Sequence, residues 1–329
     1  MAISTDARDI IYTPSEISTF GLRNLDGVKA NRANGIKFGL QKVDTELNPL
    51  MPGDLVTVIG RPGNGKTGIM MWWARQRAAH LRKTDPNRLV IYVTLEQSIE
   101  QLNAFDLAAD TGVSLTKMVR GEFDEQEREL MATAAARRVG KPLWFIGHSI
   151  ERRKKRPQIN IDLLGQALQE IEAWDEERYV IDMVFVDYLQ RIKLPPKAES
   201  KTIALDEILN RLKDGALTFG CPFVVGVQAK REVDDRNPPI PQMEDGQWTS
   251  GIEQVSDISL GVVRPRKYKA EGETFGKVAV EGDTQMIVSL MKQKMGPANI
   301  KFTMKFDPRY NTLDELEEHT YKLNEERYR

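Results

Sequence analysis

Apolar residues along this chain form short continuous runs, separated by segments in which apolar positions recur with helical spacing. The continuous runs are rich in β-branched and aromatic residues, which is typical of strands buried on both faces of a parallel sheet. They cover residues 55–59, 88–94, 142–146, 182–186 and 222–227. The segments between them predict helices over residues 68–79, 101–109, 124–139, 161–174 and 202–217. This alternation predicts an α/β fold with a mostly parallel central sheet flanked by helices.

The last third of the chain has a different pattern. Residues 230–246 are rich in Pro, Asp and Arg and have little periodicity, which predicts a long loop. Further strands are expected at residues 254–264 and 286–291, and the alternating residues 299–306 predict an edge strand. The highly charged residues 311–329 have little apolar face, and we expect a helical tail there.

The first 34 residues resemble an arm rather than part of a core. Thr13 and Glu16 have the spacing of a helix capping box, with Pro14 at the first helical position. A helix this short buries little surface by itself. We therefore expect residues 1–34 to dock on the body or on a neighbouring subunit, and residues 35–310 to form the main domain.

Composition narrows the class of protein. Charged residues make up 29% and hydrophobic residues 40% of the 329 residues, which is typical of a globular protein. The net charge of −1 gives no general attraction to nucleic acid, so any polyanion site has to be a local patch. The single cysteine, Cys221, excludes an intramolecular disulfide and predicts a buried thiol in a reducing cytoplasm. No apolar run approaches the length of a membrane span, and no membrane contact is expected.

A phosphate-binding loop pattern, G-x-x-x-x-G-K-[ST], follows the first apolar run directly. Its residues, with the next glycine, are Gly60, Arg61, Pro62, Gly63, Asn64, Gly65, Lys66, Thr67 and Gly68. The pattern is meaningful only between a strand and a helix, and both are predicted here. Lys66 is then expected to reach the β- and γ-phosphates of ATP, and the Thr67 hydroxyl to bind Mg²⁺.

Two acidic residues follow later predicted strands. Glu96 comes after residues 88–94 and Asp187 after residues 182–186. Ligands of open α/β sheets bind at the carboxyl ends of the strands, so both residues are candidates for chemistry, with Asp187 as a second anchor for Mg²⁺. The basic run at residues 152–156 is interpreted either as a solvated loop or as a contact to a phosphate backbone.

The order of these parts resembles the RecA-like ATPase domain of the bacterial replicative helicase DnaB. The similar stretches are residues 52–67, 93–98, 115–127, 184–190, 224–236, 250–257 and 291–297. The resemblance implies that Glu96 is the general base, that Asp187 holds Mg²⁺ through water and that Gln228 senses the γ-phosphate. It also implies hexameric rings with nucleotide between subunits, where a basic residue of the neighbour stabilises the transition state.

Three departures from this pattern affect the interpretation. Where the family has a Lys-x-Arg pair, this chain has Lys292 and Lys294, so trans-activation is expected to be weaker or to come from another residue, such as Arg264. The family's arginine in its DNA loop is missing, although Trp248 could stack on a base or pack under its own loop. Only a short arm precedes the ATPase region, which favours a phage, plasmid, mobile-element or defence-system relative over the housekeeping helicase.

Two functions follow from the resemblance. The first is a ring-forming, ATP-driven motor on single-stranded DNA, with basic candidates for DNA contacts at Lys201, Lys230, Arg231 and Arg236. The second is a RecA-like ATPase that assembles into a ring or filament and recruits partners without unwinding. A loader or recruiting protein would act with either form.

Overall fold

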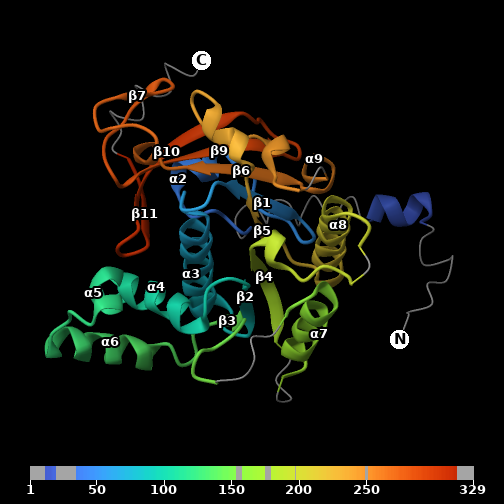
Figure 1. Ribbon diagram of the computed structural model, residues 1–329. Coiled ribbons are helices and arrows are strands. Elements are labelled where there is room, and N and C mark those ends of the chain that lie inside the picture. Colours follow the sequence, from blue (N-terminus) through green and yellow to red (C-terminus); the bar gives the residue numbers. More distant parts are fainter. Residues whose placement is uncertain are drawn as a thin grey trace.

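The computed structural model describes residues 12–19, 35–152, 158–174, 179–196, 198–248 and 251–316. Within these residues the centre of the fold is a nine-stranded sheet with the strand order β11-β10-β9-β6-β1-β5-β4-β2-β3 (Figure 1). Its strands are β1 Leu55–Gly60, β2 Arg88–Thr94, β3 Leu143–Ile146, β4 Val180–Asp187, β5 Phe223–Gln228, β6 Ile258–Val263, β9 Gln285–Gln293, β10 Ile300–Asp307 and β11 Thr312–Glu315. A separate small hairpin is formed by β7 Thr274–Phe275 and β8 Val278–Ala279.

The direction of the strands divides the sheet into two parts. The six strands from β6 to β3 run parallel to one another. The strands β9, β10 and β11 add to β6 in antiparallel register. The prediction of a mostly parallel central sheet is therefore confirmed, and the carboxyl ends of the parallel strands share one edge.

Helices cover both faces of the sheet. The helices are α2 Gln41–Glu46, α3 Lys66–Thr84, α4 Ile99–Thr111, α5 Leu115–Arg120, α6 Glu125–Arg137, α7 Ile161–Glu172, α8 Lys201–Phe219 and α9 Ile252–Val255, of which α5 and α6 pack on α4. Helix α3 packs with strand residues such as Tyr92 and Phe185 in one apolar cluster, and α7 and α8 pack with Ile91 and Val184 in a second. Among the described helices, none combines the length and apolarity needed to cross a bilayer.

Three predicted elements differ from the structure. The segment predicted as a strand from residue 254 begins in helix α9, and the strand β6 starts only at Ile258. Strand β10 is not at the edge, because β11 pairs with it through Phe306 and Leu313. The prediction of a helical tail is wrong at its start, because residues 312–315 form the strand β11. The strand is held by the burial of Leu313 and by a hydrogen bond from the Lys42 N–H to Glu315 Oε1. Residues 317–329 lie outside the described residues.

The N-terminal arm is described only over residues 12–19. Residues 14–19 are helical, and the capping box is present, because Thr13 N–H donates to Glu16 Oε2 at 2.7 Å and Glu16 N–H donates to Thr13 Oγ1 at 3.3 Å. Every residue of this segment is exposed, so it is not part of the core of its own chain. The other residues of the arm, and residues 153–156 of the basic run, lie outside the described residues.

Candidate nucleotide site

The phosphate-loop residues connect β1 to α3 in the predicted strand-loop-helix context. Gly63 and Gly65 have φ angles of +71° and +94°, a region that favours glycine. A Cβ atom built on Gly65 would lie 2.4 Å from Met286 Cε, and one on Gly63 would lie 2.2 Å from Lys267 Nζ. The shape of this loop therefore requires glycine at both positions.

Lys66 is buried at the start of α3. Its Nζ donates to the carbonyl oxygens of Gly60 at 2.8 Å and of Arg61 at 3.4 Å. Burial lowers the pKa of Lys66 to about 8, while the nearby carboxylates of Asp187 and Glu96 oppose this change. A lysine folded onto its own loop is a cation whose hydrogen bonds phosphate oxygens could replace.

Asp187 ends strand β4 beside this lysine and is buried. Its Oδ2 accepts a hydrogen bond from the Tyr92 hydroxyl at 3.0 Å, whereas Oδ1 is buried and accepts no hydrogen bond of regular geometry from the described residues. Burial raises the pKa of Asp187, and the hydroxyls of Thr67 and Tyr92 and the Lys66 ammonium oppose that rise. An unpartnered carboxylate oxygen near a threonine hydroxyl fits a hard cation such as Mg²⁺.

Glu96 follows strand β2 at the same edge of the sheet and is exposed. Its Oε1 lies 3.4 Å from Arg191 Nη2, and Arg191 Nε also donates to the Tyr188 hydroxyl at 3.2 Å. Arg191 ends the short 3-10 helix η3 Leu189–Arg191, which directly follows β4. The candidate base is therefore paired with a cation four residues after Asp187 in the chain, a contact that the sequence pattern did not predict.

Gln228 ends strand β5, between β1 and β4. Its backbone N–H donates to Gln190 Oε1 at 3.0 Å. The strand order β1-β5-β4-β2 thus places the phosphate loop, Gln228, Asp187 and Glu96 along one continuous edge. The structure brings these predicted site residues together.

Two further segments hold the phosphate loop from outside. Arg61 pairs with Asp234 in the 3-10 helix η4 Arg231–Asp235 at 2.9 Å. The Tyr268 hydroxyl accepts from Asn64 Nδ2 and donates to Asp234 Oδ1, both at 3.0 Å. Lys267 Nζ donates to the Pro62 carbonyl at 3.1 Å. Sequence reasoning missed Lys267 and Tyr268, since no motif marks residues 265–268.

Arg264 lies at its own phosphate loop. It precedes the 3-10 helix η6 Pro265–Lys267, and its backbone N–H donates to Asn64 Oδ1 at 2.9 Å. Its Nη2 donates to the Asp283 carbonyl at 2.5 Å, while its buried Nε has no partner among the described residues. This position is suited to a nucleotide contact within one chain, and less suited to a residue that reaches a neighbour.

Lys292 and Lys294 lie at the amino ends of the parallel strands, opposite the end that holds the phosphate loop. Strand β9 is antiparallel to β6, and its last residue, Gln293, pairs with Ile258, the first residue of β6. Lys292 Nζ donates to the Glu253 and Ser256 carbonyls at 2.5 and 2.7 Å, so it caps the end of α9. Lys294 is exposed, with Nζ 3.8 Å from Asp257 Oδ1. Neither lysine is placed to reach the phosphate loop of its own chain.

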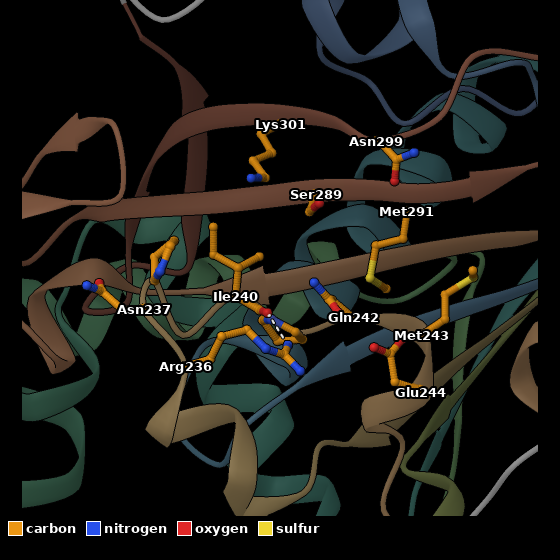
Figure 2. Close-up of a pocket in the computed structure, with 12 residues that line it drawn as sticks. Arg236, Asn237, Ile240, Gln242, Met243, Glu244, Ser289, Met291, Asn299 and Lys301 are labelled. Atoms are coloured by element: carbon orange, nitrogen blue, oxygen red, sulfur yellow. Dashed lines mark hydrogen bonds between the residues drawn. The ribbon is translucent and has the colours of Figure 1, made fainter. Parts of the chain in front are cut away.

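Arg236, a predicted DNA contact, is engaged within its own loop. It pairs with the buried Asp245 through two hydrogen bonds of 2.7 and 3.1 Å and also donates to the Ile240 carbonyl at 3.0 Å. Figure 2 shows Arg236 and Ile240 joined in this way at the wall of a cavity of about 490 Å³ between residues 236–244 and the strands β9 and β10. Its guanidinium therefore has a structural role in the loop.

The other DNA candidates are more accessible. Arg231 is exposed and Lys230 is half-buried. Trp248 is 43% exposed, and Lys201 Nζ at the start of α8 lies 3.2 Å from the centroid of its ring. A cation and an exposed ring side by side offer charge and a stacking surface to a polyanion with bases.

Comparisons with known proteins agree with this arrangement. The family model of the DnaB-like helicase C terminal domain matches residues 35–315. The replicative DNA helicase DnaB of Helicobacter pylori is 27% identical over 250 residues, which cover 75% of this chain and 48% of that protein. The corresponding helicase of Pasteurella multocida is 25% identical over 293 residues, covering 88% and 57%. A probable plasmid replicative DNA helicase of Chlamydia muridarum is 27% identical over 231 residues, covering 70% and 47%.

Solved structures support the same fold. A DnaB-like replicative helicase studied with its primase matches with a TM-score of 0.72 at 17% identity, covering 86% of this chain and 64% of that one. A solved ATPase domain matches with a TM-score of 0.77 at 17% identity, covering 93% of this chain and all of that one. The RecA-like fold prediction is confirmed, although the chain spans about half the length of the curated relatives it matches. By the family match over most of its length, this chain belongs to the family of DnaB-like helicase C-terminal domains.

Proposed function

We propose that this chain is the ATP-hydrolysing motor domain of a DnaB-like DNA helicase, acting as a ring on single-stranded DNA. The observation that carries the proposal is the edge shared by β1, β5, β4 and β2, where Lys66, Asp187 and Glu96 meet. The relatives are described as replicative helicases, and one as a probable plasmid helicase. The plasmid relative supports a role on a phage or mobile element.

The described residues fit ATP with Mg²⁺. When bound, Mg²⁺ would neutralise charge on the phosphates, with Thr67 and Asp187 as its protein ligands. No group of three or more His, Cys, Asp or Glu residues among the described ones could hold a metal alone. This agrees with a cation that keeps several waters and binds mainly to substrate phosphates.

The roles of the remaining residues follow from their positions. Lys66 would exchange its bonds to the Gly60 and Arg61 carbonyls for phosphate oxygens. Glu96 would leave Arg191 to polarise the attacking water. Gln228 ends β5, the strand between β1 and β4, and would contact the γ-phosphate.

Hydrolysis would require a neighbouring subunit. Lys294 is exposed at the edge of the sheet opposite the phosphate loop, so in a head-to-tail ring it could face the nucleotide of the next subunit. Lys292 is bound to the end of α9 and is the weaker candidate. A lysine would stabilise transition-state charge as a point charge, without the bidentate fork of arginine.

A second candidate function is an assembly module that uses ATP to form a ring or filament without unwinding DNA. One observation favours it: the pairing of Arg236 with Asp245 removes one predicted cation from the DNA surface. Recruitment of a loader or another partner protein would then be its main activity.

Steady-state ATP hydrolysis with and without single-stranded oligonucleotide, at increasing salt, separates the two functions. A motor is expected to be stimulated by DNA, and the stimulation should fade with salt because backbone phosphates are contacted. Glu96→Gln serves as the control that binds nucleotide without turnover. Slow turnover that is indifferent to DNA at every salt concentration would reject the motor and favour the assembly module.

A further inference from the structure

Gln190 occupies a fixed position between Asp187 and the end of strand β5. It is the middle residue of η3, and the residue before it, Leu189, is fully buried. The backbone of Gln190 is therefore anchored three residues from the candidate Mg²⁺ ligand. Its side chain is half-buried and forms hydrogen bonds with backbone groups of Gln228 and Gln247.

The Gln190 amide joins two segments that are distant in sequence. Its Oε1 accepts from the Gln228 N–H at 3.0 Å, and its Nε2 donates to the Gln247 carbonyl at 2.9 Å. One partner can only donate and the other can only accept, so the orientation of the amide is determined. A flipped amide would lose both hydrogen bonds.

Both partners of Gln190 belong to one short ladder. Gln247 N–H donates to the Gln228 carbonyl at 2.8 Å, and Ala229 and Gly246 form an isolated antiparallel bridge. The next residue after Gln247 is Trp248, which has a φ of +57° and lies against Lys201. Paired backbone thus connects the end of β5 to the residue before Trp248, and the Gln190 amide bonds both strands of this pairing.

We propose that Gln190 is a positioning residue that couples the nucleotide site to the loop of residues 245–248. A nucleotide that moves Gln228 changes the hydrogen bond from the Gln228 N–H to the Gln190 amide. Because the same amide donates to the Gln247 carbonyl, the loop then changes position together with Trp248. By thermodynamic linkage, a ligand that binds this loop changes the affinity for nucleotide by the same factor as nucleotide changes the affinity for that ligand. An effect of DNA on the nucleotide site through this loop rests on the proposed function. The effect of nucleotide on the loop does not depend on DNA binding.

The first measurement is the emission of Trp248 during titration with a non-hydrolysable ATP analogue. Four other tryptophans also emit, so each spectrum is corrected by subtracting the spectrum of the same protein with Trp248→Phe added. The difference is the emission of Trp248. We expect a change in the wild type and no change in Gln190→Ala, although Gln190→Ala still binds the analogue. An unchanged Trp248 response in Gln190→Ala, or the lack of any response in the wild type, would overturn the proposal.

Two further variants separate coupling from loop stability. Gln190→Glu keeps the acceptor for Gln228 N–H but loses the donor to the Gln247 carbonyl, so it should also lose the response while retaining more of the folded stability than Gln190→Ala. Gln166→Ala, an exposed glutamine on α7, is the matched control and should behave as the wild type. A full response in Gln190→Glu would contradict the role of the Gln247 contact.

The second measurement is the stimulation of ATP hydrolysis by single-stranded DNA. Allosteric couplings typically correspond to factors of about 5 to 150, so we expect Gln190→Ala to lose at least about fivefold of the stimulation while its DNA-free rate is largely kept. Equal stimulation in the wild type and Gln190→Ala would overturn the proposal. A wild type that DNA does not stimulate would reject the motor function, and the Trp248 response would still decide whether Gln190 couples the two segments.

Discussion

The Arg191 guanidinium faces the Glu96 carboxylate, with 3.4 Å between Nη2 and Oε1. Both side chains are about half exposed, so the attraction between them is screened by solvent. In this contact the Oε1 atom of Glu96 is engaged with a guanidinium rather than with a water molecule. The pair therefore describes a resting arrangement that has to open before Glu96 can act on water.

We predict that Arg191→Ala raises the hydrolysis rate in the absence of DNA. Exposed ion pairs contribute about 0.2–1 kcal/mol, so the expected increase is about 1.4- to 5-fold. Steady-state phosphate release measures the rate, and Arg211→Ala, which breaks an exposed pair with Asp162 on the surface, is the control. A clear decrease with Arg191→Ala would mean that the guanidinium assists catalysis instead of holding the base.

Lys66→Ala is predicted to weaken nucleotide binding. The hydrogen bonds of a charged group contribute about 1.5–3 kcal/mol, which corresponds to a loss of about 10- to 150-fold in affinity. Titration with a fluorescent ATP analogue measures the dissociation constant, and Lys83→Ala, on the exposed end of α3, is the matched control. Unaltered affinity in Lys66→Ala would reject the assignment of the phosphate loop.

Lys292 and Lys294 are predicted to differ, although both occupy the position of the family's basic pair. Lys292→Ala removes donors to two carbonyls at the end of α9 and should lower the melting temperature. Lys294→Ala changes an exposed side chain and should leave the melting temperature unaltered while reducing turnover. Mixing Lys294→Ala subunits with Glu96→Gln subunits should restore part of the activity if the lysine acts in trans. Mixtures whose activity is only the sum of the two would exclude that role.

Arg231 and Arg236 form a second matched pair. Arg231→Ala removes an exposed charge and should reduce the salt dependence of single-stranded DNA binding by about one counterion without affecting stability. Arg236→Ala removes the ion-pair partner of the buried Asp245, which keeps a hydrogen bond from the Gln242 N–H, and should destabilise the protein by about 1.5–3 kcal/mol. Binding isotherms at several salt concentrations and urea denaturation measure the two effects. If Arg236→Ala weakens DNA binding with no loss of stability, Arg236 is a DNA contact after all.

The strands and the nucleotide edge were predictable because they depend on local patterns. Continuous apolar runs identify buried strands, and a polar residue directly after such a run lies at the carboxyl edge, as Glu96, Asp187 and Gln228 do. Strand β11 was not predictable in this way. Its four residues contain one buried apolar side chain, Leu313, and its position depends on pairing with β10.

The partners of charged side chains were not predictable either. Arg236 and Asp245 are nine residues apart in a loop without periodicity, so their pairing depends on how that loop folds back. Lys292 caps α9, a four-residue helix that the apolar residues around it led us to predict as part of a strand. A basic residue in a promising stretch looks the same in the sequence whether it is free or engaged, and only the structure separates Arg236 from Arg231.

Cys221 offers a last prediction, which concerns the folded state as a whole. It precedes β5 and is buried, and burial raises the pKa of its thiol to about 12. At pH 8 the native thiolate fraction is then about 10⁻⁴, compared with about a quarter for an unfolded cysteine. Alkylation by iodoacetamide should therefore be slow and should accelerate with urea as the chain opens. Between about pH 9 and pH 12 only the unfolded state releases this proton, so the free energy of unfolding should fall as the pH rises, and Cys221→Ala should reduce that slope. Native alkylation as fast as that of a free thiol would contradict the buried position of Cys221.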